Sequence, residues 1–229
     1  MKTAGIVGGI APASTIDYYR SIVDGYRALR PDGSYPSIVI DSIDMQRMLA
    51  LAATDLQALA DYLAAEIQRL VDARAHFALL ASNTPHIVFD ELRRRSPIPL
   101  LSIVEASCDA ARRAGLTRLG LLGTRFTMEG RFYPDVFSRA GIGLVSPRAD
   151  ERTLVHERYM GELVKGVFLP GTRAELLRVV ERMAREEGVE AVLLAGTELP
   201  LILRGVDAGV PLLDTTQIHV RAAVERLLE

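Results

Sequence analysis

The sequence predicts an α/β protein made of two similar halves, each a doubly wound parallel sheet. Three observations predict this fold: short uninterrupted apolar runs that end in small or polar residues, amphipathic segments between them, and a second copy of the series further along the chain. Uninterrupted apolar runs are typical of strands buried on both faces of a parallel sheet. Their alternation with helical segments indicates the doubly wound class.

The predicted strands form three matched pairs in the same order. The pairs are residues 4–7 and 119–122, residues 77–81 and 191–195, and residues 98–102 and 210–214. Their spacing is nearly constant: Gly8 to Gly123 is 123 − 8 = 115, Ser82 to Gly196 is 196 − 82 = 114, and Pro99 to Pro211 is 211 − 99 = 112. A repeated series at constant spacing indicates an internal duplication.

The segments between the strands carry apolar stripes of helical period. One stripe is formed by Leu56, Leu59, Leu63, Ile67 and Leu70, and its counterpart in the second half by Leu176, Leu177, Val180 and Met183. Steps of three and four residues place such side chains on one helix face, which we expect to cover a sheet.

The duplication predicts two domains that face each other across a cleft. We expect the first domain to span residues 1–98 plus 207–229, and the second to span residues 99–206. In this interpretation, the strands containing Pro99 and Pro211 each pack in the opposite half, so that the last segment returns to the first domain.

The composition excludes several functions. The net charge of −2 over 229 residues provides no field for nucleic acid or an anionic membrane, and the basic run Arg93–Arg95 is expected to end a helix. No apolar run is long enough to span a membrane. A single cysteine and the lack of metal, dinucleotide, phosphate-loop or GxSxG motifs predict no metal and no bound cofactor. We expect a soluble, cytoplasmic protein.

The polar residues of the chain gather where the predicted strands end. These segments are Gly8–Pro12, Ser82–Thr84, Gly123–Arg125 and Gly196–Glu198. Ligands of doubly wound folds bind beyond the carboxyl ends of the strands. Hydroxyls, an amide and backbone N–H groups such as that of Gly9 suit a small carboxylate ligand.

These motifs together resemble the aspartate/glutamate racemase superfamily. The resemblance rests on Gly8–Thr15 followed by Tyr18-Tyr19, on Asn83–His86, on Leu122–Met128, on Thr197-Glu198, and on Asp214-Thr215 with Ile218-His219, so it runs nearly end to end. It implies a homodimer of two-domain α/β subunits that acts on a small acidic amino acid or dicarboxylate without pyridoxal phosphate, NAD or metal.

Both thiols on which racemases of this superfamily depend are absent here. The resemblance places the first cysteine immediately before the Asn-Thr pair, at Ser82, and the second immediately before the Thr-Glu pair, at Gly196. The internal repeat aligns the same two positions. A serine hydroxyl is a far poorer base than a thiol, and glycine can only leave space for water or substrate. Symmetric two-base racemisation through Ser82 and Gly196 is therefore not chemically plausible.

The resemblance also implies roles for other residues. Asn83, Thr84 and Thr124 inherit the role of holding the substrate carboxylate, while Arg47 and Lys165 resemble the cations that grip a dicarboxylate. A solvated surface position is the alternative for both cations.

Four residues are candidates for catalysis: Ser82, His86, Thr197 and Glu198. Glu198 is a possible general base, with orientation of Thr197 as its alternative role. His86 could act as an acid, activate the Ser82 hydroxyl as a base, or only support the site. Cys108 falls in a predicted helix and is expected to be a buried structural thiol.

Two functions remain open from the sequence. The first is an enzyme that transfers a proton at the α-carbon of an acidic substrate, as an isomerase or as a lyase or decarboxylase on the same scaffold. The second is a degenerate homologue that binds an acidic metabolite without turning it over. Deliberate replacement of the thiols is a third interpretation, for which glycine is an unusual choice.

Overall fold

The computed structural model describes residues 2–229 as two compact units. Unit 1 contains residues up to Ile103 together with Thr216–Glu229, and unit 2 contains Val104–Thr215. Each unit has one four-stranded parallel sheet, in the order β2-β1-β3-β4 in unit 1 and β6-β5-β7-β8 in unit 2. The two orders correspond strand for strand. The predicted fold class is therefore confirmed, and the topology agrees with an internal duplication.

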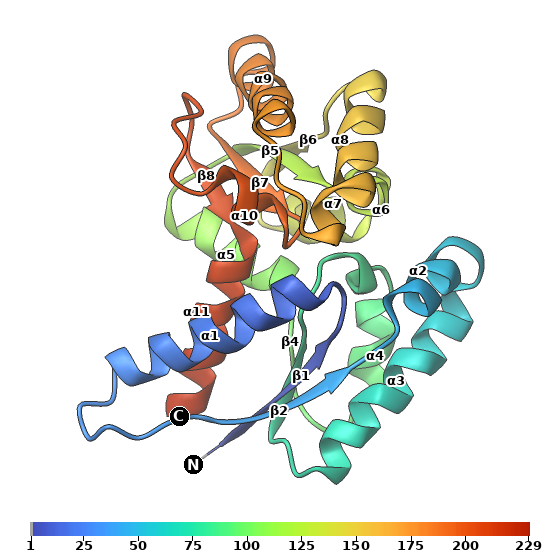
Figure 1. The fold of residues 1–229 in the computed structure, drawn as a ribbon, viewed down its shortest axis with the longest axis vertical. Coiled ribbons are helices and arrows are strands. Elements are labelled where there is room, and N and C mark those ends of the chain that lie inside the picture. The colour runs from blue at the N-terminus through green and yellow to red at the C-terminus, as the bar shows by residue number, and fades with distance from the viewer. Residues whose placement is uncertain (1) are drawn as a thin grey trace. The chain divides into compact units, whose positions relative to one another are not determined.

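Unit 1 begins with the central strand of its sheet. Its elements are β1 (Thr3–Gly8), α1 (Pro12–Ala28), β2 (Ser37–Ser42), α2 (Met45–Thr54), α3 (Leu56–Asp72), β3 (Phe77–Leu80), the 3-10 helix η1 (Thr84–Val88), α4 (Phe89–Arg95) and β4 (Leu100–Leu101), and α11 (Thr215–Leu228) joins them from the end of the chain. Figure 1 shows α11 running beside α1. Side chains of both helices, including Tyr18, Ile22 and Val224, share one core with β1 and β3.

Unit 2 repeats this arrangement with different helices around its sheet. Its elements are α5 (Ile103–Arg113), β5 (Arg118–Gly123), α6 (Arg125–Glu129), α7 (Phe132–Arg139), β6 (Gly143–Val145), α8 (Ala149–Gly161), the 3-10 helix η2 (Leu163–Lys165), α9 (Pro170–Glu187), β7 (Ala191–Ala195), α10 (Leu199–Leu203) and β8 (Leu212–Asp214). Its core combines β5, β7, α8 and α9.

The central strands are the most deeply buried parts of the chain. All residues of β3 and β7 are buried, as are all but the first of β1 and β5, whereas the edge strands β4 and β8 are half-buried. Burial of a Val, Leu or Ile side chain contributes about 1.5–3 kcal/mol. These strands therefore fix the positions at which the polar strand-end residues begin.

The amphipathic stripes face the cores, with one exception. Leu59, Leu63, Ile67 and Leu70 of α3 are buried. Leu56, which we placed on the same stripe, is instead 43% exposed. It is the first residue of α3, where Asp55 caps the helix through a hydrogen bond from the Ala58 amide. The cap sets where the helix starts, and Leu56 lies beyond the edge of the packed surface.

The exchange between the halves involves helices rather than strands. β4 pairs with β3 of its own half and β8 pairs with β7 of its own half, so the expected strand exchange was wrong. The helices that follow these strands, α5 and α11, belong to the opposite units instead. The resulting division at Ile103 and Thr215 lies several residues beyond the predicted limits at residues 98 and 206.

The basic run ends a helix, as predicted. α4 stops at Arg95, and Ser96 is extended before Pro97. Arg93 stacks on the Phe89 ring, Arg94 pairs with Glu91, and Arg95 Nη1 lies 2.7 Å from Asp61 Oδ1. None of the helices in residues 2–229 is long and apolar enough to cross a membrane.

Candidate functional site

The predicted site residues form one group in each unit. Half-site 1 consists of Gly9, Ser82, Asn83 and Thr84, which follow the neighbouring central strands β1 and β3. Half-site 2 consists of Thr124, Gly196, Thr197 and Glu198, which follow the neighbouring strands β5 and β7. Because the paired strands are parallel, each half-site lies at the carboxyl edge of its own sheet.

Gly9 is fixed in a tight connection at half-site 1. Its φ of +84° favours glycine, and an added Cβ would lie 2.5 Å from the Ile43 carbonyl oxygen. Its N–H donates to Thr15 Oγ1 at 2.8 Å. The backbone N–H that we predicted to bind substrate is thus engaged with the first turn of α1.

The Ser82-Asn83-Thr84 segment is buried at the end of β3. The exposed fractions are 7%, 2% and 4%, respectively. The Asn83 carbonyl accepts from the His86 amide at 3.0 Å, which starts the 3-10 helix η1. The segment therefore has little conformational freedom, and half-site 1 is preformed.

His86 belongs to a buried pair of histidines beneath half-site 1. Its Nε2 accepts from the Ile103 amide at 3.2 Å, and its ring stacks on Phe89 with centroids 4.7 Å apart. Burial, with a smaller effect of nearby His219, lowers the pKa of His86 to about 3. A neutral imidazole whose Nε2 already accepts a hydrogen bond is suited to support the Ser82 segment. Activation of the Ser82 hydroxyl by His86 stays a prediction.

His219 connects α11 to the sheet of unit 1. Its Nε2 lies 3.2 Å from the Leu101 carbonyl oxygen and its Nδ1 lies 2.9 Å from the Tyr18 hydroxyl. A carbonyl can only accept, so Nε2 carries the proton and Nδ1 accepts from Tyr18. Burial lowers the pKa of His219 to about 4.

Thr124 shapes the β5 end of half-site 2. It caps the short helix α6, with Oγ1 accepting from the Thr127 amide at 3.4 Å and lying 3.3 Å from Thr127 Oγ1. The preceding Gly123 has no room for a side chain, because a Cβ would lie 2.5 Å from the Ala195 carbonyl oxygen. The two central strand ends therefore approach each other closely in unit 2.

Tyr159 fills the space beside Gly196. A Cβ added at position 196 would lie 2.5 Å from Tyr159 Cε2 and 2.9 Å from its hydroxyl oxygen. The expectation that glycine leaves space for water or substrate on this side is therefore wrong. Glycine is required here by the packing of the phenol ring, which comes from α8 and is itself only 5% exposed.

Glu198 is almost completely buried and is held through one oxygen. Both the Tyr159 hydroxyl and the Thr197 hydroxyl donate to Oε2, the latter at 3.0 Å. The other oxygen, Oε1, is buried and has no hydrogen-bond partner among residues 2–229. A buried carboxylate oxygen without a partner is costly, so this one calls for a functional explanation.

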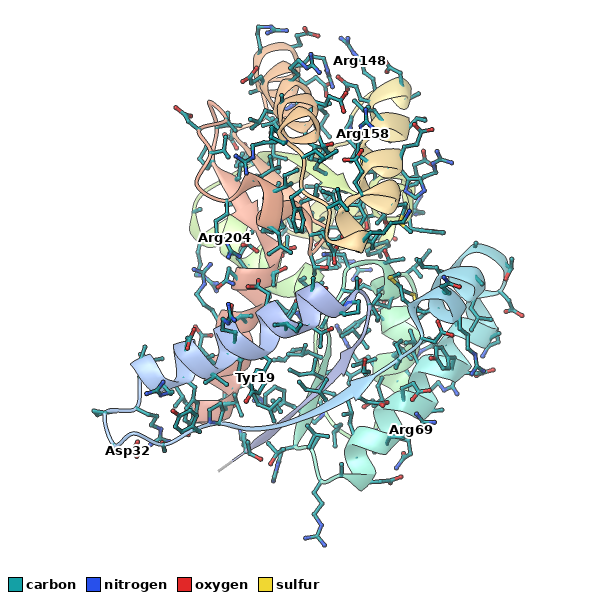
Figure 2. The ribbon with its side chains drawn as sticks, viewed as in Figure 1. Tyr19, Asp32, Arg69, Arg148, Arg158 and Arg204 are labelled. Carbon is teal, nitrogen blue, oxygen red and sulfur yellow. The ribbon has the colours of Figure 1, made fainter. Side chains whose placement is uncertain are left out.

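Ion pairs hold the end of α8 that carries Tyr159. Arg158 donates to both carboxylate oxygens of Glu175 on α9, at 2.6 and 3.1 Å, and to Glu162 at 2.9 Å. Figure 2 labels Arg158 on α8. Bidentate arginine–carboxylate pairs fix orientation, so the network keeps Tyr159 in place beside half-site 2.

The two predicted cations lie on the surface of their units. Arg47 is exposed in the first turn of α2, and its guanidinium stacks on the Tyr62 ring at 4.4 Å. Lys165 is exposed at the end of η2 and has no carboxylate partner among the described residues. Their assignment to substrate binding stays a prediction.

Cys108 lies in α5 and is 6% exposed. Burial, with a smaller effect of Asp109, raises the pKa of its thiol, which favours the unreactive protonated form. No group of three His, Cys, Asp or Glu side chains in residues 2–229 is placed to hold a metal ion.

A pocket of about 520 Å³ lies in unit 2 around the segment between α10 and β8. Arg204 and Asp214, 3.3 Å apart, line it together with residues 205–212. None of the predicted site residues lines this pocket.

Sequence reasoning missed Tyr159. It lies 198 − 159 = 39 residues before Glu198, on a helix whose buried residues are Val155 and Tyr159 itself. The signal that was available is Gly196, which stands at a position where the resemblance implies a cysteine side chain. A lost side chain in a packed interior indicates that another residue occupies its volume.

Comparison with known proteins gives a consistent result. The Asp/Glu/Hydantoin racemase family matches residues 7–223. A crystal structure of a putative Asp/Glu racemase from Yersinia pestis is 32% identical, with a TM-score of 0.90 and full coverage of both chains. An aspartate racemase homologue from Pyrococcus horikoshii OT3 is 30% identical, with a TM-score of 0.86 and full coverage of both. The broad specificity amino-acid racemase RacX of Bacillus subtilis is 20% identical over 98% of this chain and 97% of its own.

Proposed function

Because the chain belongs to the Asp/Glu/hydantoin racemase family, we propose that it catalyses proton transfer at the α-carbon of a small acidic amino acid or dicarboxylate, without a bound cofactor. In this proposal, Glu198 is the base in place of the missing thiols. Asn83, Thr84 and Thr124 hold the substrate carboxylate, and Arg47 and Lys165 bind its second carboxylate.

The observation that carries the proposal is the state of the Glu198 carboxylate. Two hydroxyl groups donate to Oε2, whereas Oε1 is buried and has no partner. A carboxylate fixed through one oxygen presents the other in a defined direction, as a general base requires. Its burial lowers the local dielectric constant, which strengthens electrostatic interactions with a bound substrate.

The proposed step is a simple proton transfer. The Cα–H bond of the substrate breaks, and its proton forms an O–H bond with Oε1 of Glu198. The electron pair moves into the substrate carboxylate, which becomes an enediolate. The reverse step returns a proton to the carbon, and exchange of the Oε1 proton with water introduces solvent hydrogen.

We expect hydrogen exchange to be faster than inversion. Inversion needs a second proton donor, and the resemblance places the first thiol at the position of Ser82. A serine hydroxyl is a far poorer proton donor or acceptor than a thiol. Return of the proton from Glu198 to the same face therefore dominates.

A second candidate function is binding of an acidic amino acid without turnover. The unpartnered Oε1 of Glu198 favours it as well. Oε1 could accept a hydrogen bond from the ammonium group of a ligand rather than its α-proton. Both candidates predict binding, and only the first predicts chemistry at the α-carbon.

The test is proton NMR of aspartate, glutamate and related dicarboxylates incubated with the protein in D₂O. Loss of the α-proton signal in the wild type, abolished by Glu198→Gln and retained by Cys108→Ala, supports proton transfer by Glu198. New resonances would identify elimination or decarboxylation on the same scaffold. Binding by calorimetry without exchange or product would refute turnover and establish the binding protein for the acids tested.

The proposal includes a cytoplasmic homodimer. Sedimentation at micromolar concentration should give about twice the 25.0 kDa mass of the chain. A monomer at that concentration would remove this part of the proposal.

A further inference from the structure

We propose that Tyr159 takes the place of the missing second thiol and acts as the positioning residue of Glu198. This inference rests on the proposed proton transfer. It assigns to unit 2 an oxygen-based pair, Tyr159 and Glu198, at the position where other members of the superfamily use sulfur.

Steric contact is the first argument. The Tyr159 ring and hydroxyl lie 2.5–3.0 Å from where a Cβ of residue 196 would be. No left-handed backbone conformation requires glycine at this position. Gly196 and the Tyr159 ring are thus mutually dependent: a cysteine at position 196 would have to displace the phenol, and the phenol can occupy this place only beside glycine.

Hydrogen bonding is the second argument. The phenol donates to Oε2 of Glu198, beside the bond from Thr197. Donation by both hydroxyls to one oxygen leaves Oε1 as the only free acceptor of the carboxylate. The Tyr159 ring, which occupies the space of the missing thiol, therefore also orients the Glu198 carboxylate, which takes over its chemical role.

Rigidity of the supporting helix is the third argument. Arg158, next to Tyr159, is bound bidentately to Glu175, and Arg182 of α9 is bound bidentately to Glu151 in the first turn of α8. α8 is thus tied to α9 near both of its ends. A hydroxyl on a fixed helix can hold a carboxylate in one orientation, as preorganised catalysis requires.

Tyr159 keeps its proton throughout the step. Burial and then the negative charge of Glu198 raise the pKa of Tyr159 well above its ordinary value. The phenol therefore stays a donor to Oε2 while Oε1 accepts and returns the substrate proton. The electron balance of the step is unchanged, because the phenol O–H bond does not break.

The first experiment compares Tyr159→Phe with the matched variant Tyr133→Phe in the D₂O exchange assay. Tyr133 is also a buried tyrosine of unit 2, with 0% exposure, and lies on α7. We expect Tyr159→Phe to lower kcat about 10- to 100-fold with little change in KM, as loss of one charge-assisted hydrogen bond predicts. Tyr133→Phe should exchange like the wild type.

The second experiment tests the contact without reference to activity. Tyrosines labelled with ¹³C at Cζ are titrated by NMR in the wild type and in Glu198→Gln, with the Tyr159 signal identified by its loss in Tyr159→Phe. We expect the Tyr159 signal to shift in Glu198→Gln and to titrate at lower pH than in the wild type, while the Tyr133 signal stays unchanged.

The outcomes separate the two proposals. An unchanged Tyr159 signal in Glu198→Gln, or wild-type exchange in Tyr159→Phe, overturns the positioning role even if the wild type exchanges α-protons. A shifted Tyr159 signal in a protein that exchanges no substrate supports the contact and refutes the proton transfer that it was to serve.

Discussion

The buried histidines of unit 1 should make the protein lose stability at mildly acidic pH. His86 and His219 are 2% and 0% exposed, and their pKa values are lowered to about 3 and about 4. Both are neutral in the folded protein at pH 5. In the unfolded chain, each takes up a proton as the pH falls below about 6.5. The unfolded state then binds more protons than the folded state. The free energy of unfolding must therefore decrease as the pH is lowered.

The magnitude follows from the width of this window. Each histidine contributes about 1.4 kcal/mol per pH unit between about 6.5 and its folded pKa. Going from pH 7 to pH 5 crosses about 1.5 units of the window, which gives about 2 kcal/mol per histidine and about 4 kcal/mol for the pair. The loss continues below pH 5 until the folded pKa values are reached.

The assay is urea unfolding at pH 7 and pH 5, followed by far-ultraviolet circular dichroism because the chain has no tryptophan. The variants are His86→Gln, His219→Gln and the double variant, and each is compared with itself at the two pH values. Carboxylates contribute equally to the pH-dependent loss of stability in the wild type and the variants, so their contribution cancels when the losses are compared. We expect each single variant to lose about 2 kcal/mol less than the wild type, and the double variant about 4 kcal/mol less. Equal losses in the wild type and the double variant would refute the reasoning.

Three further predictions follow from the sites. Gly196→Ala should destabilise the wild type by about 1–3 kcal/mol in urea unfolding, because the added methyl group meets the Tyr159 ring. The same substitution should cost little in a Tyr159→Ala background, where the methyl group enters a cavity. Equal costs in both backgrounds would contradict the contact. Replacing Arg47 or Lys165 with methionine should weaken binding of an aspartate-like ligand about 10- to 100-fold in calorimetry, and unchanged binding in both variants would remove their assignment. Cys108 should react with a thiol reagent only at the rate of unfolding, and Cys108→Ala should retain exchange activity; rapid labelling of the folded protein would show that the thiol is accessible.

The duplication was predictable because it shows in short, local sequence patterns. Each central strand is a short apolar run that ends in glycine or a small polar residue, and such a pattern does not depend on distant contacts. The exchange of α5 and α11 was not predictable in this way. A helix shows the same amphipathic pattern whichever sheet it covers, and the short edge strands β4 and β8 do not indicate which neighbour they have.

Some features of the candidate site were also predictable from local sequence patterns, and others were not. Ser82, Thr124 and Glu198 were located from the sequence because parallel strand ends meet at one edge of a sheet. The state of Glu198 was not, since its orientation depends on Tyr159, a residue far away along the chain. Burial of His86 could not be predicted from the sequence either, because it depends on the packing of Phe89 and the start of α5.

The helix exchange also determines the order in which the molecule can be completed during synthesis. Unit 2 ends at Thr215, whereas unit 1 requires α11 for its core, through Val220, Ala223 and Val224. On the ribosome, most of unit 1 is made before unit 2, but its core must wait for α11, which is translated after unit 2, so unit 1 finishes folding last. In the finished protein, Lys2 and Glu229 are bound to each other at 2.9 Å. A circularly permuted chain that joins these ends and opens near Ile103 would translate unit 2 first and then unit 1 as one uninterrupted segment.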